Sequence, residues 1–272
     1  MSEPGPPRRP HPLERGPAPP PSSPDPQRRR IQVPTSRPIL TYVLLGVIIL
    51  FFVVQQASAA QQPRQVIVDP FTDRFMKAND AIIRNGEYYR LFTAMFLHGS
   101  VLHLFFNAYA LFIIGSSVEL LFGTARFAII YFLGGLTGSI ASLVFTPAPS
   151  LGASGAIFAL LGAEGVFFYF HRDLFGVYGR SRFANIVFVA AINLVLGFAA
   201  NSLIDNWGHI GGLFGGLVLA WFIGPRLRIN QQYIGGPVEI VDDNPLQRAW
   251  LTALVYAVGW VLILLFVVSS LG

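Results

Sequence analysis

The chain has 272 residues, of which 53% are hydrophobic and only 12% are charged, and its mean hydropathy is +0.54. This composition excludes an ordinary water-soluble domain and indicates helices that face lipid. The net charge of +5 does not indicate nucleic-acid binding, because the arginines lie beside apolar runs, where they act as topology signals. The absence of cysteine excludes a disulfide, a thiol nucleophile and a cysteine-bound metal.

The N-terminal segment 1–37 is rich in proline and arginine and has almost no large apolar side chains. It cannot bury a core, so we expect a disordered cytoplasmic tail. The apolar run 39–54 follows as the first predicted membrane helix. Behind it, Ala57-Ser58-Ala59 resembles a signal-peptidase site, but the tail is long and the run is at the long end for a signal, which favours a retained helix.

Residues 57–97 are polar and charged but carry apolar and aromatic side chains, and predict a large, partly folded extracytoplasmic loop. Six further apolar runs lie close to the 20 or so residues that cross a bilayer. They are approximately Val101–Leu121, Phe127–Phe145, Ser154–Phe170, Phe183–Ala200, Gly208–Gly224 and Trp250–Leu271. The predicted fold class is therefore an all-α polytopic membrane protein with seven helices.

Positive charges predict the orientation of these helices. Arginines precede the first helix and lie in the connections after the second, fourth and sixth, all on one side when the runs are threaded alternately. The first loop carries both signs of charge and counts for less. We expect a multi-pass protein of the plasma (inner) membrane, with a cytoplasmic N-terminus and an extracytoplasmic C-terminus.

Polar residues inside membrane helices are costly and usually functional. His103 and Asn107 lie early in the second helix, Ser154 opens the fourth, and His209 opens the sixth. Because these helices run from outside to inside in the predicted threading, the four residues share one depth near the outer face. Ser154 beside His209 would suffice for acyl transfer. Asn107 and His103, one helical turn apart, can donate hydrogen bonds to an oxyanion, together with the Ser154 N–H.

The spacing of these residues resembles the signature blocks of the rhomboid intramembrane proteases. The blocks are His98-x4-His103-x3-Asn107, Gly152-Ala153-Ser154-Gly155 and His209-x2-Gly212-x3-Gly216, with weaker likenesses at Tyr89-Arg90 and Glu119-x3-Gly123. The resemblance covers residues 38–225 and implies a six-helix rhomboid-like core, followed by a cytoplasmic linker (226–248) and an extra transmembrane helix (249–272).

The resemblance also implies roles for particular residues. Ser154 would be the nucleophile, His209 the general base, and His103 and Asn107 the oxyanion donors. Phe158 stands where the family often has a tyrosine packed on the catalytic histidine.

Other residues lie near the predicted site. Gly152 permits a tight turn before the nucleophile. His98 either shapes the site or is an interfacial histidine. Glu164 lies ten residues beyond Ser154, about 15 Å deeper, too far to orient His209. Asp205 remains open as a third catalytic member.

The predicted activity is serine endopeptidase cleavage of single-span membrane proteins near their extracytoplasmic end, with no metal or cofactor. One alternative is a catalytically inactive rhomboid-like protein that binds membrane clients or assists quality control. Another is a transporter, which would suit the intramembrane Glu164, but no internal repeat supports it. The expected partners are the bilayer and the substrates, not nucleic acid, and the oligomeric state stays open.

Overall fold

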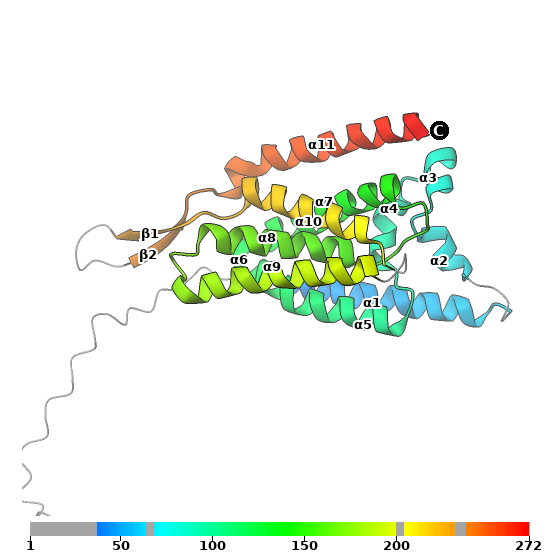
Figure 1. Cartoon of the computed structure of the whole chain (residues 1–272), viewed down its shortest axis with the longest axis horizontal. Coiled ribbons are helices and arrows are strands. Elements are labelled where there is room, and N and C mark those ends of the chain that lie inside the picture. Colours follow the sequence, from blue (N-terminus) through cyan, green and yellow to red (C-terminus); the bar gives the residue numbers. More distant parts are fainter. Residues whose placement is uncertain (1–36, 64–67, 200–203, 232–237, 272) are drawn as a thin grey trace, which may run out of the picture.

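The computed structural model describes residues 37–63, 68–199, 204–231 and 238–271, so most of the predicted tail lies outside the described residues. Seven long helices run side by side within these ranges (Figure 1), which confirms the predicted all-α polytopic fold. They are α1 (Ile39–Ala60), α5 with η3 and α6 (Val101–Ala110, Leu111–Gly115, Ser116–Phe122), α7 (Thr124–Phe145), α8 (Ser154–Phe170), α9 (Gly176–Ala199), α10 (Asn206–Ile223) and α11 (Leu246–Leu271).

Five of these helices are long and apolar enough to cross a membrane, namely α1, the α5–α6 unit, α7, α9 and α11. The α5–α6 unit contains one π-helical turn, η3, at its centre. Helices α8 and α10 have 17 and 18 residues and carry Ser154 and His209. The two helices that begin with the predicted nucleophile and base are therefore among the shortest of the seven.

Helix α1 continues to Ala60, six residues beyond the predicted end at Val54. Its last turns stay helical because the polar side chains there have partners in the following loop. Gln55 is buried and donates to the Thr72 hydroxyl at 2.7 Å and to the His98 carbonyl at 3.2 Å. Long-range hydrogen bonds thus compensate the polarity that suggested an earlier end.

The loop after α1 folds into short helices, α2 (Pro70–Phe75), α3 (Asn79–Asn85), α4 (Arg90–Thr93) and η2 (Ala94–Phe96), which gather at one end of the bundle (Figure 1). Asp69 caps α2 by accepting from the N–H groups of Phe71 and Thr72. Arg90 on α4 links three parts of this loop. It pairs with Glu87 at 2.6 Å and donates to the carbonyls of Asp73 and Met76.

Helices α7, α8 and α10 form the centre of the bundle. Helix α8 is buried on nearly every side, as expected of a helix that is apolar all round. Helix α10 approaches it closely through glycines. A Cβ on Gly212 would lie 2.0 Å from the Gly155 carbonyl oxygen, and a Cβ on Gly216 would lie 1.9 Å from that of Ala159. This small-residue contact fixes the distance between the starts of α8 and α10.

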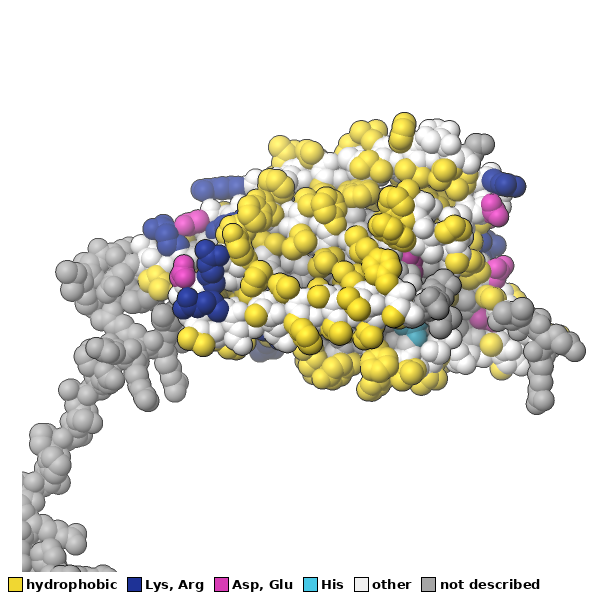
Figure 2. Space-filling model, in the orientation of Figure 1, with side chains coloured by type: hydrophobic (Ala, Val, Ile, Leu, Met, Phe, Trp, Pro, Cys, Tyr) yellow, Lys and Arg dark blue, Asp and Glu magenta, His cyan; other side chains and the backbone are white. Residues whose placement is uncertain are grey.

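An antiparallel hairpin, β1 (Leu227–Gln231) and β2 (Val238–Asp242), precedes α11. The predicted linker did not include it, because the segment is short and its pairing depends on contacts with the bundle. Asp242 pairs with Arg126 at 2.8 Å, and the Leu227 N–H donates to the ring of His171 at 2.8 Å. The hairpin lies at the opposite end from α2–α4, and Figure 2 shows Lys and Arg gathered there.

Candidate active site

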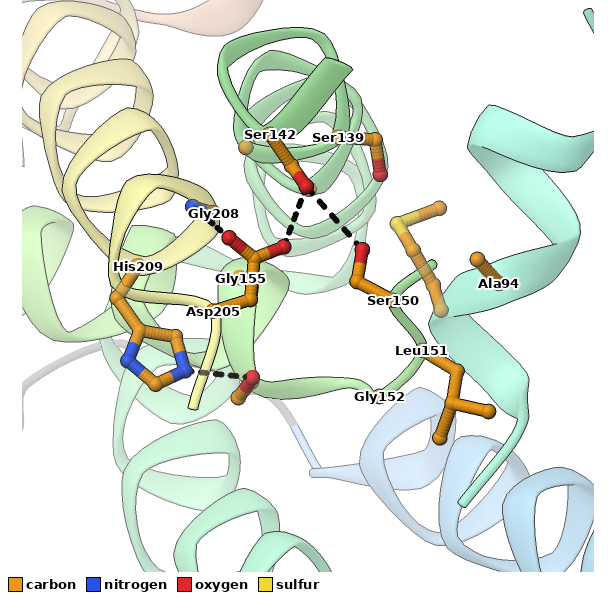
Figure 3. Close-up of a pocket in the computed structure, with 14 residues that line it drawn as sticks. Ala94, Ser139, Ser142, Ser150, Leu151, Gly152, Gly155, Asp205, Gly208 and His209 are labelled. Atoms are coloured by element: carbon orange, nitrogen blue, oxygen red, sulfur yellow. Dashed lines mark hydrogen bonds between the residues drawn. The ribbon is translucent and has the colours of Figure 1, made fainter. Parts of the chain in front are cut away.

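Ser154 and His209 meet at the starts of α8 and α10, although 55 residues separate them in the chain. The Ser154 Oγ lies 2.8 Å from the His209 Nε2 (Figure 3). Asp205 starts α10, since its carboxylate accepts from the Gly208 N–H at 3.1 Å. The predicted pair is therefore within hydrogen-bond distance, in the arrangement that proton transfer from a serine hydroxyl requires.

The ring of His209 is held by stacking. Phe158, one turn beyond Ser154 on α8, lies parallel to the imidazole, with 4.4 Å between ring centroids and 8° between planes. The Nδ1 of His209 has no hydrogen-bond partner among the described residues. The aromatic contact that the sequence resemblance implies is present, and no side chain orients the imidazole through Nδ1 in the described part of the chain.

The carboxylate of Asp205 points away from His209, which argues against a triad. It accepts from the Ser142 hydroxyl near the end of α7 (Figure 3). It also accepts from the Thr146 hydroxyl at 2.9 Å. Burial alone would raise the pKa of Asp205, but these bonds, with the Gly208 N–H, outweigh it and hold the pKa below its usual range.

Gly152 makes the turn that presents Ser154. Its φ of +135° lies in a region that L side chains rarely adopt. Its N–H donates to the Ala94 carbonyl at 2.9 Å, which anchors the turn on η2. A Cβ here would lie 2.9 Å from the His103 Nε2. Position 152 therefore favours glycine for two reasons, its backbone conformation and the closeness of the His103 ring.

His103 and Asn107 lie on the face of α5 beside this turn. His103 approaches Gly152, as the contact above shows, and its Nδ1 accepts from the Gly99 N–H at 3.4 Å. Asn107 is buried, and its side-chain amide donates to the His103 carbonyl at 3.0 Å. The structure thus brings His103 to the Ser154 turn, whereas the hydrogen bond found for Asn107 lies within its own helix.

His98 lies on a different side of the site. It is 1% exposed, both of its ring nitrogens lack a partner among the described residues, and its ring packs edge-on against His103 at 5.1 Å. Burial, with the nearby His103, lowers the pKa of His98 to about 3. It lines a separate cavity of about 320 Å³ that also touches Leu151. The contact that joins His98 to the residues around Ser154 is thus its ring contact with His103.

A small cavity of about 40 Å³ adjoins Ser154 and His209. Sequence reasoning missed its polar wall, which consists of Ser139, Ser142 and Ser150 together with Asp205 (Figure 3). A signal was present, because Ser139 and Ser142 are three residues apart on an apolar helix and so share a face. Leu151 lines this cavity as well as the larger one.

The Rhomboid domain matches residues 85–226, just over half of the chain. This chain belongs to the rhomboid family. It is 40% identical over 188 residues to the Rhomboid protease GluP of Bacillus subtilis (strain 168), covering 69% of this chain and 35% of GluP. It is 32% identical over 200 residues to the RHOMBOID-like protein 1 of Arabidopsis thaliana, covering 67% of this chain and 50% of that protein.

The Putative rhomboid protease YdcA of Bacillus subtilis (strain 168) is 34% identical over 141 residues, which cover 51% of this chain and 69% of YdcA. The aligned part of this rhomboid spans about a third to a half of the first two relatives. Family membership and the apolar helices identify a multi-pass integral membrane protein.

Two acidic residues of this rhomboid have structural partners deep in the bundle. Glu164 is fully buried and accepts from Ser117 at 2.7 Å and from Arg182 on α9 at 2.8 Å. Glu119 on α6 accepts from the N–H groups of Leu40 and Thr41 at the start of α1. Glu164 therefore makes interhelical hydrogen bonds, as its depth predicts.

Proposed function

We propose that this rhomboid is a serine endopeptidase that cleaves the membrane segments of other proteins, with Ser154 as nucleophile and His209 as general base. The 2.8 Å contact between the Ser154 Oγ and the His209 Nε2 carries the proposal. His209 takes the hydroxyl proton as the oxygen attacks the peptide carbonyl, and gives it to the amine that leaves. Water then hydrolyses the ester on Ser154, with His209 again as base.

The tetrahedral intermediate needs hydrogen-bond donors for its oxyanion. The Ser154 N–H, at the start of α8, has no intrahelical acceptor, and the dipole of α8 favours negative charge there. His103 beside Gly152 supplies a second donor in its Nε2–H tautomer, which its Nδ1 contact with the Gly99 N–H favours. The Asn107 amide, which has a second N–H, would supply a third after a small rotation.

The stacked Phe158 supports a two-residue mechanism. A triad uses a carboxylate to fix the imidazole, whereas here the parallel ring at 4.4 Å restricts His209 to one plane. The first glycine contacts between α8 and α10 lie within one turn of both residues, which limits how far they can separate. Rigid positioning would therefore replace the third catalytic group.

The position of the cut follows from the orientation that we propose. Arginines at the hairpin end favour a cytoplasmic location for that end. Ser154 and His209 then face the extracytoplasmic side, and cleavage falls near the outer end of a single-span substrate. Small or helix-breaking residues there would lower the cost of unwinding the substrate helix. Products cut in the cytoplasmic third, mapped by mass spectrometry, would contradict this orientation.

The activity is tested with the purified full chain and a single-span substrate. Ser154→Ala and His209→Ala should each abolish cleavage. Ser269→Ala should not, because Ser269 is exposed and its hydroxyl donates to the Phe266 carbonyl of its own helix. A fluorophosphonate probe should label the parent and not Ser154→Ala. Cleavage that persists in Ser154→Ala would refute the assignment. Folded protein with neither cleavage nor labelling would instead favour an inactive client-binding rhomboid.

A further inference from the structure

The hairpin end of the bundle carries an excess of positive charge (Figure 2). Three arginines near this end are neutralised by carboxylates, in the pairs Arg126–Asp242, Arg182–Glu164 and Arg228–Asp243. Two others, Arg172 and Arg226, form no ion pair with a carboxylate in the described part of the chain. Their charges are therefore available to an anion from outside the protein.

Both of these arginines lie where a central helix ends. Arg172 comes two residues after the end of α8, and Arg226 comes three residues after the end of α10. The two helix ends are adjacent, because the ring of His171 accepts from the Leu227 N–H at 2.8 Å. The backbone of Arg226 is fixed as well, since its N–H donates to the Asp242 carboxylate at 2.8 Å. The ends of α8 and α10 thus hold the two charges in place.

Aromatic rings support both guanidinium groups. The Arg172 guanidinium lies 4.9 Å from the centre of the Tyr169 ring, and that of Arg226 lies 3.3 Å from the centre of the Phe170 ring. Trp221 of α10 joins the two rings, with centroid distances of 6.4 Å to Tyr169 and 4.7 Å to Phe170. We name these five residues the α8–α10 end cluster.

The guanidinium groups keep N–H donors for a ligand. Arg226 uses one donor on the Trp221 carbonyl, and a guanidinium has five. A ring beneath the plane of the group leaves its edge open, and this edge is what binds a phosphate through paired hydrogen bonds. The α8–α10 end cluster therefore has the chemistry of a phosphate site.

An apolar stripe on α10 begins at this cluster and runs toward the middle of the bundle. Phe214, Leu217 and Trp221 are 54%, 40% and 48% exposed, and they share one face because they are three and four residues apart. We name them the α10 stripe. From Phe214 to Trp221 the helix rises about 10 Å, against about 15 Å for half of a bilayer's hydrocarbon core. The stripe therefore follows most of the depth that one acyl chain occupies.

We propose that the α8–α10 end cluster binds an anionic phospholipid, with the headgroup phosphate at Arg172 and Arg226 and one acyl chain along the α10 stripe. A free phosphate would use the arginines but not the stripe. Phosphatidylcholine would bring a choline cation to rings whose faces already carry guanidinium groups. Basic and aromatic side chains at the end of a membrane helix lie at the depth of the headgroups.

The bound lipid would connect the ends of two neighbouring helices. The opposite ends of α8 and α10 carry Ser154 and His209, so the lipid lies far from the predicted reacting groups. The inference therefore concerns a ligand site of its own and does not depend on the proposed protease function.

The test measures lipid binding to the purified full chain after its lipids have been removed in detergent. Native mass spectrometry gives the apparent Kd for dioctanoyl phosphatidylglycerol and for dioctanoyl phosphatidylcholine. Phosphatidylglycerol should bind about 10- to 100-fold more tightly, as expected of charge-assisted hydrogen bonds. In thermal unfolding, phosphatidylglycerol should protect the protein, and inorganic phosphate at the same concentration should not.

Variants locate the site. Arg172→Gln and Arg226→Gln should each weaken phosphatidylglycerol binding by about 10-fold and leave phosphatidylcholine binding within about twofold. Arg180→Gln is the matched control, because it removes the same charge from an exposed position on α9 near the same end. Within the described ranges Arg180 has neither a ring contact nor an ion pair. Its substitution should keep the parental Kd.

Three results would overturn the proposal. They are equal Kd values for the two lipids in the parent, a loss in Arg180→Gln as large as in Arg172→Gln, and protection by phosphate equal to that by phosphatidylglycerol. The second result would show a general attraction to positive charge instead of a site. If Arg226→Gln does not fold, Arg172→Gln still decides, because Arg172 is exposed in the turn after α8.

Discussion

Substituting Gly212 by alanine should separate the nucleophile from the base without touching either. A Cβ at this position would lie 2.0 Å from the Gly155 carbonyl oxygen, and that obstacle is backbone rather than a flexible side chain. Since carbon and oxygen do not approach below about 3 Å, α10 must retreat from α8 by about 1 Å. Gly155 follows Ser154, and Gly212 lies one turn beyond His209, so this retreat acts directly on the pair.

The size of the effect follows from the site geometry. The Oγ to Nε2 distance of 2.8 Å would grow to about 3.8 Å, beyond the range of a hydrogen bond. A misplacement of 1 Å can cost about 100-fold in rate, and overpacking costs about 1–3 kcal/mol of stability. We therefore expect Gly212→Ala to lower kcat by about 100-fold while the protein still folds.

The assay compares cleavage of a single-span substrate, fluorophosphonate labelling and thermal unfolding. Gly46→Ala and Gly259→Ala are the matched controls, because each adds the same methyl group to a helix where nothing lies within 4 Å. Both should keep parental activity. Parental kcat in Gly212→Ala, or an equal loss in the controls, would refute the argument that close helix packing sets the dyad distance.

Two further substitutions test other parts of the site. Asn107→Ala should reduce turnover by about 10²- to 10³-fold with little change in melting temperature, as for loss of one oxyanion donor; an activity loss that follows the unfolded fraction would show that packing explains it. His98 has a folded-state pKa of about 3 against an ordinary 6.5. Because the unfolded chain takes up a proton on this histidine before the folded protein does, acid lowers the free energy of unfolding. The stability is fully present above pH 6.5 and falls by about 2 kcal/mol at about pH 5. Denaturant unfolding at about pH 5 and pH 7 should show less acid sensitivity in His98→Gln, and equal sensitivity would contradict this account.

The helices and the contact between Ser154 and His209 were predictable because each follows from a local pattern. Apolar runs of membrane-spanning length define the helices, and alternate threading places the starts of the even-numbered ones at one depth. The contact between Ser154 and His209 required only that rule and the glycines that permit close packing. The resemblance to rhomboids added the stacked Phe158, which no periodicity would have indicated.

The features that were missed depend on contacts between distant segments. Lys77 belongs to a polar loop, and nothing in its neighbourhood indicates that it is buried and binds the carbonyls of Thr146 and Ala148. Asp205 was weighed as a partner for His209 because four residues separate them. Its actual partners, Ser142 and Thr146, lie about 60 residues earlier in the chain. Sequence spacing predicted the contact between Ser154 and His209 but not the residues that surround it.

The short length of α8 explains how water can reach Ser154 inside a membrane protein. Helix α8 has 17 residues and is about 25 Å long, which is less than the roughly 30 Å of a bilayer's hydrocarbon core. Helix α7 beside it has 22 residues and spans the full thickness. If their ends near the β1–β2 hairpin are level, Ser154 lies several ångströms below the opposite membrane surface, and the loop from Thr146 to Gly152 descends to it. Irregular backbone at that depth needs partners, and Lys77 and Ala94 provide them, while Asp205 accepts from the Thr146 hydroxyl. The buried polar groups around this loop are therefore what allows a short α8 to hold its serine below the membrane surface and still in reach of water.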